Sequence, residues 1–136
     1  MANVDSNTAS MNALRDAVFG LAKQQGKYDC QPNIAPLLMH AIGEVNEAHT
    51  AYMEGKRAAT EDVEVLKRLL DESNVPVFKK YFKAAVKSTF EDELADIILM
   101  ILSIAGYYNI DIESHIKLKH AYNALRDEHS AVNNYK

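Results

Sequence analysis

Residues 91–102 read EDELADIILMIL, and this stretch decides the fold class. Two acids three positions apart, Glu93 and Asp96, lead directly into six consecutive apolar residues at 97–102. A helix that is apolar on all sides packs in the interior of a protein, so the stretch predicts a buried central helix. The first turns of that helix must then hold carboxylates against the core.

The rest of the chain shows helical periodicity as well. Apolar residues recur at steps of three and four, and no strand-like alternation extends beyond four residues. Helix-boundary signals are found at Ser10, Gly26, Gly55, Thr60 and a capping box formed by Ser88 and Glu91. These signals predict helices at about 10–26, 34–54, 60–73, 77–86, 88–107 and 112–130. We therefore expect an all-α helical bundle of about five to six helices, with one domain over 1–136 and flexible ends at 1–9 and 131–136.

Composition narrows the function classes. The chain has 136 residues, of which 48% are hydrophobic, and 15 Lys and Arg against 19 Asp and Glu give a net charge of −4. This balance argues against nucleic-acid binding through a basic surface. The single cysteine, Cys30, cannot form an internal disulfide. No apolar run approaches the roughly 20 residues that span a bilayer, so we expect a cytoplasmic protein without a membrane or nucleic-acid partner.

A second helix repeats the acidic pattern. Glu44 and Glu47 lie three residues apart and therefore share a face, among the small side chains of Ala41, Ala48 and Ala51. Neither acidic stripe is interleaved with Lys or Arg, and unpaired carboxylates are costly to bury. A divalent cation held by Glu44, Glu47, Glu93 and Asp96 resolves this conflict, and oxygen donors alone favour Mg²⁺, with Mn²⁺ as a substitute. Two solvated acidic faces are the alternative.

The last helix carries a complementary charge. Lys119, Asn123 and Arg126 fall at i, i+4 and i+7 and so lie on one face. Cations and an amide facing a metal site suit phosphate oxygens, although a solvated surface stripe has the same pattern. No His follows a Glu at the third position, so the Glu-x-x-His pairs of di-iron bundles are absent from the sequence.

At these residues the sequence resembles the MazG-type, all-α nucleoside triphosphate pyrophosphohydrolases, in the short form common in phages and bacteria. The family pattern is ExxE, then ExxD on a later helix, then a Lys/Asn/Arg set. Here it reads Glu44-Val45-Asn46-Glu47, Glu93-Leu94-Ala95-Asp96, and Lys119, Asn123 and Arg126. The likeness covers roughly residues 12–127. It differs at Lys27, one of two positions where relatives often carry aromatics.

The resemblance implies an enzyme. It would hydrolyse a nucleoside or deoxynucleoside triphosphate between the α and β phosphates in a Mg²⁺-dependent reaction, with house-cleaning of the nucleotide pool as the role that the resemblance implies. The four acids would bind metal, Glu44 or Glu47 would act as general base, and Lys119, Asn123, Arg126 and Tyr28 would bind substrate. The alternative is a related helical module that binds nucleotide or a partner without catalysis.

The resemblance also implies a homodimer or homotetramer. The chain itself adds a second apolar face, formed by Val77, Phe78, Tyr81, Phe82 and Val86. That face could cover the core of the same chain or pack on a partner.

Overall fold

The computed structural model describes residues 10–30 and 33–125, and within them it contains six helices and no strand. The prediction of an all-α protein with five to six helices is confirmed. The predicted flexible ends, 1–9 and 131–136, lie outside the described residues, as does Arg126. The helices are α1 (Met11–Gln24), α2 (Ile34–Met53), α3 (Thr60–Asp71), α4 (Val75–Ala85), α5 (Phe90–Tyr107) and α6 (Ile112–Ala124).

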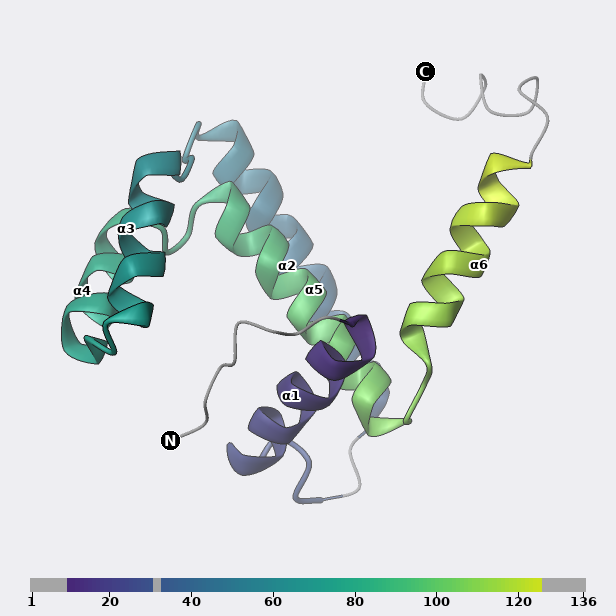
Figure 1. Ribbon diagram of the computed structural model, residues 1–136. Helices are drawn as coiled ribbons and strands as arrows, with labels where there is room; N and C mark the ends of the chain where they lie inside the picture. The colour runs from purple at the N-terminus through teal and green to yellow at the C-terminus, as the bar shows by residue number, and fades with distance from the viewer. Residues whose placement is uncertain (1–9, 31–32, 126–136) are drawn as a thin grey trace.

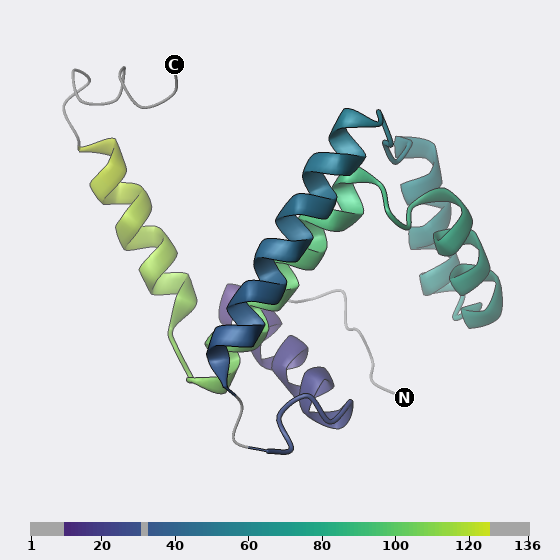
Figure 2. The same ribbon diagram turned by 180° about the vertical axis from the view of Figure 1, so that it is seen from behind.

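An antiparallel pair, α2 and α5, forms the centre of the structure (Figures 1 and 2). The pair is joined at one end, where the Phe90 amide donates to the Lys56 carbonyl at 2.9 Å. Along α2 the buried residues are all alanines: Ala41, Ala48 and Ala51. Their spacing of seven and three keeps them on one stripe, and their small side chains let the two backbones approach closely.

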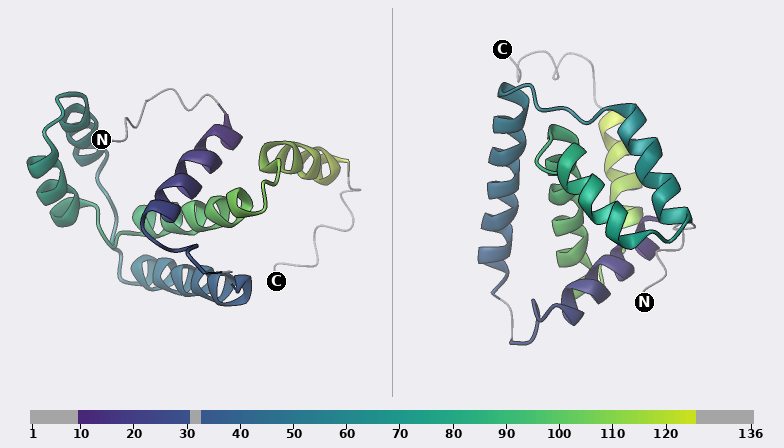
Figure 3. Two further views of the ribbon diagram at one scale, coloured as in Figure 1. Left: turned by 90° about the horizontal axis from the view of Figure 1, so that it is seen from below. Right: turned by 90° about the vertical axis from the view of Figure 1, so that its left-hand side faces the viewer.

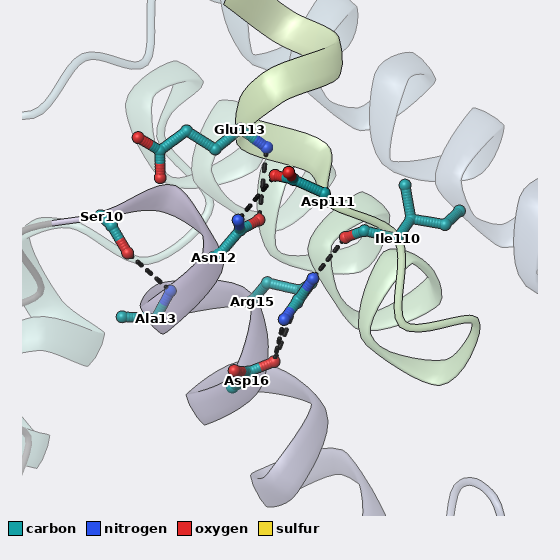
Figure 4. A network of polar contacts seen from close by, with 8 residues as sticks. All are labelled: Ser10, Asn12, Ala13, Arg15, Asp16, Ile110, Asp111 and Glu113. Atoms are coloured by element: carbon teal, nitrogen blue, oxygen red, sulfur yellow. Dashed lines mark hydrogen bonds and ion pairs between the residues drawn. The ribbon is translucent and has the colours of Figure 1, made fainter.

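Helix α1 packs across α5 near its end (Figure 3). Contact there is so close that a Cβ added to Gly106 would lie 2.4 Å from the Cβ of Phe19. The buried guanidinium of Arg15 donates to the carbonyl of Ile110 just beyond α5. Asn12 donates to Asp111 at 2.7 Å and accepts the Glu113 amide at 3.3 Å, which ties α6 to α1 (Figure 4). These long-range bonds fix the direction in which α6 leaves the body.

The other end of the α2–α5 pair carries a hairpin of α3 and α4 (Figure 3). The two helices pack on each other, with Leu66 and Leu69 buried. The Tyr81 hydroxyl donates to Asp62 at 2.6 Å across the hairpin. The second apolar face predicted on α4 therefore packs chiefly against α3 of the same chain.

The expectation that α5 is buried on every side is wrong for a single chain. Among the described helices, α1 and α2 alone pack extensively on α5, and none of the others covers its third face to a similar extent. Leu94, Ile98 and Ile101 on that face are 41%, 53% and 46% exposed. Five of the nine buried hydrophobic residues in the described part are alanines, so the core of one chain is small.

Helix ends follow the predicted signals, with two corrections. Ser10 caps α1, and Gly26 and Gly55 adopt positive φ after α1 and α2. The cap of α5 is Thr89, one residue after the predicted Ser88, because Ser88 itself takes a positive φ of 62°. Thr60 is the first residue of α3 rather than its cap.

No described helix is by itself long and apolar enough to cross a membrane. Helices α5 and α6 meet the length and composition criteria only when taken together, and they are bent by 117° at their break.

The Gly106 contact yields a stability prediction. We expect Gly106→Ala to lower the free energy of unfolding by about 1–3 kcal/mol, because the new methyl group meets Phe19 and the Arg15 carbonyl. Gly43→Ala on α2 is the control, since nothing lies within 4 Å of its added Cβ. The free energy of unfolding of Gly43→Ala should rise by roughly 0.5–1 kcal/mol, because alanine favours the helix more than glycine does. Urea unfolding measures the stability of both variants. Equal changes in the free energy of unfolding for Gly106→Ala and Gly43→Ala would contradict the close packing of α1 on α5.

Candidate functional site

Three of the predicted acids converge between α2 and α5. One carboxylate oxygen from each of Glu44, Glu47 and Glu93 lies within 4.8 Å of the other two. Glu44 occupies the alanine stripe that faces α5, and Glu47 lies nearly one turn further along α2. Glu93 belongs to the first turn of α5 and is only 5% exposed. The close helix contact therefore brings the carboxylates together.

The cluster is electrostatically strained. Burial raises the pKa of Glu93, and the negative charges of Glu47, Asp92, Asp96 and Glu44 raise it further. Among the described residues, no Lys or Arg forms an ion pair with Glu44, Glu47, Glu93 or Asp96. The imidazole of His40 lies 3.7 Å from Glu44, and it is charged only when protonated. The folded protein thus favours either protons or a cation at this cluster.

The donor set fits a hard divalent cation. It consists only of carboxylate oxygens, which Mg²⁺ and Mn²⁺ prefer, and it offers neither the thiolates nor the imidazole set typical of zinc. Mg²⁺ commonly takes one or two protein carboxylates and keeps water in its other positions, so three convergent carboxylates suffice.

Asp96 lies outside this triplet. It is exposed and one turn after Glu93, and it opens onto a groove of about 260 Å³ between α1, α2 and α5. Glu44 lines the groove beside Asp96, whereas Tyr28 and Ser103 line it further along α5. Seven residues of helix separate Asp96 from Ser103, or about 10 Å. The groove therefore extends from the acids toward an uncharged end.

Tyr28 lines the uncharged end of the groove and is held there by its neighbours. The Tyr28 hydroxyl is hydrogen-bonded to the Ser103 hydroxyl at 2.8 Å. The Tyr28 ring is stacked on Tyr107, with centroids 5.2 Å apart, and meets Phe19 edge-on. Tyr28 is consequently held by the protein on one ring face and at its hydroxyl.

The described residues of the predicted cationic stripe, Lys119 and Asn123, do not face the acids within one chain. Lys119 and Asn123 are exposed on α6, which packs on α1 and stands apart from α2 (Figure 1). The Lys119 ammonium lies 4.9 Å from the centroid of the Tyr122 ring. Arg126 lies outside the described residues. The i, i+4, i+7 spacing predicted that these residues share one face of a helix, but it could not predict which element that face would meet.

Three lysines missed by the sequence analysis come near the acids instead. Lys56 lines a cleft with Glu47 and Glu93, but it is paired with Glu54.

Lys27 and Lys87 form no ion pair among the described residues. Lys27 lines the groove together with Glu44 and Asp96. Lys87 lines a second cleft, of about 460 Å³, between α5 and the hairpin, and Asp96 also lines this cleft. Both lysines lie in turns between helices, where no periodic pattern marks a functional residue.

Comparisons of this chain with protein-family models, with curated proteins and with solved structures gave no match.

The carboxylate cluster predicts a metal response. When a chelator removes divalent metal, Glu93→Gln should have a higher melting temperature than the wild type. The neutral amide relieves the desolvation and the repulsion that raise the pKa of Glu93. Added Mg²⁺ should stabilise the wild type by about 2.7 kcal/mol at a concentration 100 times its Kd. Glu93→Gln should lose most of this gain. Thermal unfolding with and without Mg²⁺ measures both effects.

The control is Glu61→Gln, the same substitution at an exposed position on α3. It should keep the wild-type response to Mg²⁺. A Glu93→Gln variant that is stabilised by Mg²⁺ as strongly as the wild type would refute the metal assignment.

Proposed function

We propose that the chain is a Mg²⁺-dependent pyrophosphohydrolase of nucleoside or deoxynucleoside triphosphates. The observation that carries the proposal is the convergence of Glu44, Glu47 and Glu93 within 4.8 Å, without Lys or Arg pairs in the described part of the chain. These are acids of the two motifs on which the resemblance to MazG-type enzymes rests. The groove beside Glu44 and Asp96 supports the proposal because it offers room for a ligand next to the acids. A cytoplasmic location is part of the same proposal.

In the proposed reaction, water cleaves the anhydride bond between the α and β phosphates. The water oxygen bonds to phosphorus, the bond from that phosphorus to the bridging oxygen breaks, and a monophosphate and pyrophosphate leave. Glu44 or Glu47 accepts the proton that the water loses. Bound Mg²⁺ would neutralise phosphate charge and lower the pKa of a coordinated water. Glu93, Asp96 and the remaining α2 carboxylate would hold the metal.

The groove suggests how substrate is oriented. A volume of about 260 Å³ is near the lower end of the roughly 300–1,000 Å³ typical of small-molecule sites, so it suits part of a nucleotide. Its uncharged end, at Tyr28 and Ser103, suits the nucleoside, and its acidic end suits metal-bound phosphates. In this arrangement the rate gain comes mainly from fixed charges and positioning.

Pyrophosphate release tests the proposal. With Mg²⁺ or Mn²⁺, the wild type should release pyrophosphate from at least one member of a panel of canonical and damaged nucleotides. Glu47→Gln should lower kcat by about 100-fold or more, because it removes either the base or a metal ligand. Glu61→Gln should keep wild-type turnover. Nucleotide binding without turnover across the whole panel would instead identify a non-catalytic nucleotide-binding module.

We also propose that the protein works as a homodimer or homotetramer. On α2, the exposed residues Leu38, Ile42 and Val45 lie at helical spacing, and on α5 Leu94, Ile98 and Ile101 do the same. These six side chains are 41–53% exposed. Large contiguous apolar faces are rare on monomers and are typical of interfaces. Two copies of an antiparallel helix pair, packed by this face around a two-fold axis, form a four-helix bundle.

Size-exclusion chromatography with light scattering tests the assembly. The wild type should have at least twice the 15.2 kDa mass of one chain. Ile98→Glu should shift it toward the monomer and lower its stability, because a charge would enter the apolar interface. Gln24→Glu, which adds the same charge at an exposed position on α1, should leave the mass unchanged. A monomeric wild type at micromolar concentration would overturn the assembly.

A further inference from the structure

The proposed function requires cations for the phosphate groups of the substrate, and this inference rests on it. Lys119, the cation of the predicted stripe that the structure describes, does not face the acids within one chain. We propose that Lys27 and Lys87 bind the phosphates, one on each side of Asp96, with Lys87 holding the pyrophosphate portion. Each lysine comes from a different turn, so the two approach the acids from different elements.

Lys27 is fixed at the end of α1. Its amide donates to the Ala22 carbonyl at 3.1 Å, and the preceding residue, Gly26, has a φ of +77°. This combination is a Schellman-type helix end, which sets the backbone position of Lys27. Its side chain lines the 260 Å³ groove together with Glu44 and Asp96. Lys27 therefore lies on the groove side of Asp96.

Lys87 is fixed at the end of α4. Its amide donates to the Phe82 carbonyl at 2.9 Å, and the next residue, Ser88, turns the chain with a positive φ. Its side chain lines the 460 Å³ cleft, with Asp92, Asp96 and Leu99 on the α5 side. Asp96 and Leu99 line the groove as well, so the two spaces share these residues. In this proposal the triphosphate extends past Asp96 from one space toward the other.

The charges of both lysines are available to a ligand. Both side chains are exposed, and among the described residues neither forms an ion pair. Lys27 and Asp96 line the same groove, and Lys87 and Asp96 line the same cleft. An ammonium on a long flexible stem can bind a phosphate oxygen as a point charge.

No acid that lines the cleft forms an ion pair with Lys87. Glu91 is paired with Arg57 at 2.5 Å and also accepts the Ala58 amide at 2.9 Å. Asp92 accepts the Ser88 amide at 2.8 Å, at the start of α5. Lys87 is the one Lys or Arg among the residues that line this cleft, and it forms no ion pair with them.

Binding of inorganic phosphates tests the inference without requiring turnover. Calorimetry would use inorganic triphosphate and inorganic pyrophosphate, each with Mg²⁺, on the full chain. Lys87→Met should raise the Kd of both ligands by about tenfold or more, the loss expected for a charged hydrogen bond. Lys27→Met should raise the Kd of triphosphate by a similar factor and that of pyrophosphate less. Lys87→Arg keeps the charge and should keep most of the affinity.

Lys80→Met and Lys23→Met are matched controls, because these lysines lie on α4 and α1 but line neither space. They should bind both ligands like the wild type. The inference is overturned if the wild type binds neither ligand, or if Lys87→Met and Lys27→Met behave like the controls. Lysine-dependent binding without hydrolysis of any nucleotide would instead contradict the proposed reaction and leave this inference standing.

Discussion

The close packing of α2 on α5 is the constraint on which the rest of the structure depends. Small side chains at Ala41, Ala48 and Ala51 let the two helices approach, and the same stripe carries Glu44. Close approach then forces the carboxylates of Glu44, Glu47 and Glu93 within 4.8 Å of one another. A sequence selected for stability alone would not place like charges in this seam, because their mutual repulsion and desolvation oppose folding. The local conflict between packing and charge is typical of functional sites.

The same helix pair explains why one chain has so little core. Helix α5 is apolar around its circumference, but within a chain it is covered by α1 on one side and α2 on another. The third side, with Ile98 and Ile101, continues directly from the acidic first turn. Covering that side would bury more apolar area and would also lower the dielectric constant around Glu93. In the proposed assembly, oligomerisation and metal binding would therefore reinforce each other.

Sequence patterns predicted the parts of this structure that depend on local spacing. Periodicity gave the helices, and Gly26 and Gly55 marked helix ends because positive φ favours glycine. The acid spacing predicted two acidic faces, three of whose carboxylates the fold brings together. Local sequence patterns could not predict the direction of α6, because it depends on contacts such as that of Asn12 with Asp111, 99 residues apart. Lys27 and Lys87 were missed because isolated lysines in turns carry no periodic signal.

The proposed site divides its charges between two kinds of structure. Its acids lie on the seam of two packed helices, and Glu93 is buried there, so their positions are set by the fold. Its two lysines extend from turns whose backbones are tied to helix ends, while their ammonium groups stay exposed. A metal ion needs ligands at fixed distances, whereas a phosphate chain changes shape as a bond in it breaks. Rigid carboxylates beside adaptable ammonium groups meet both requirements. In the proposed site, the lysines in the turns would therefore contribute to substrate selection as much as the acidic motifs do.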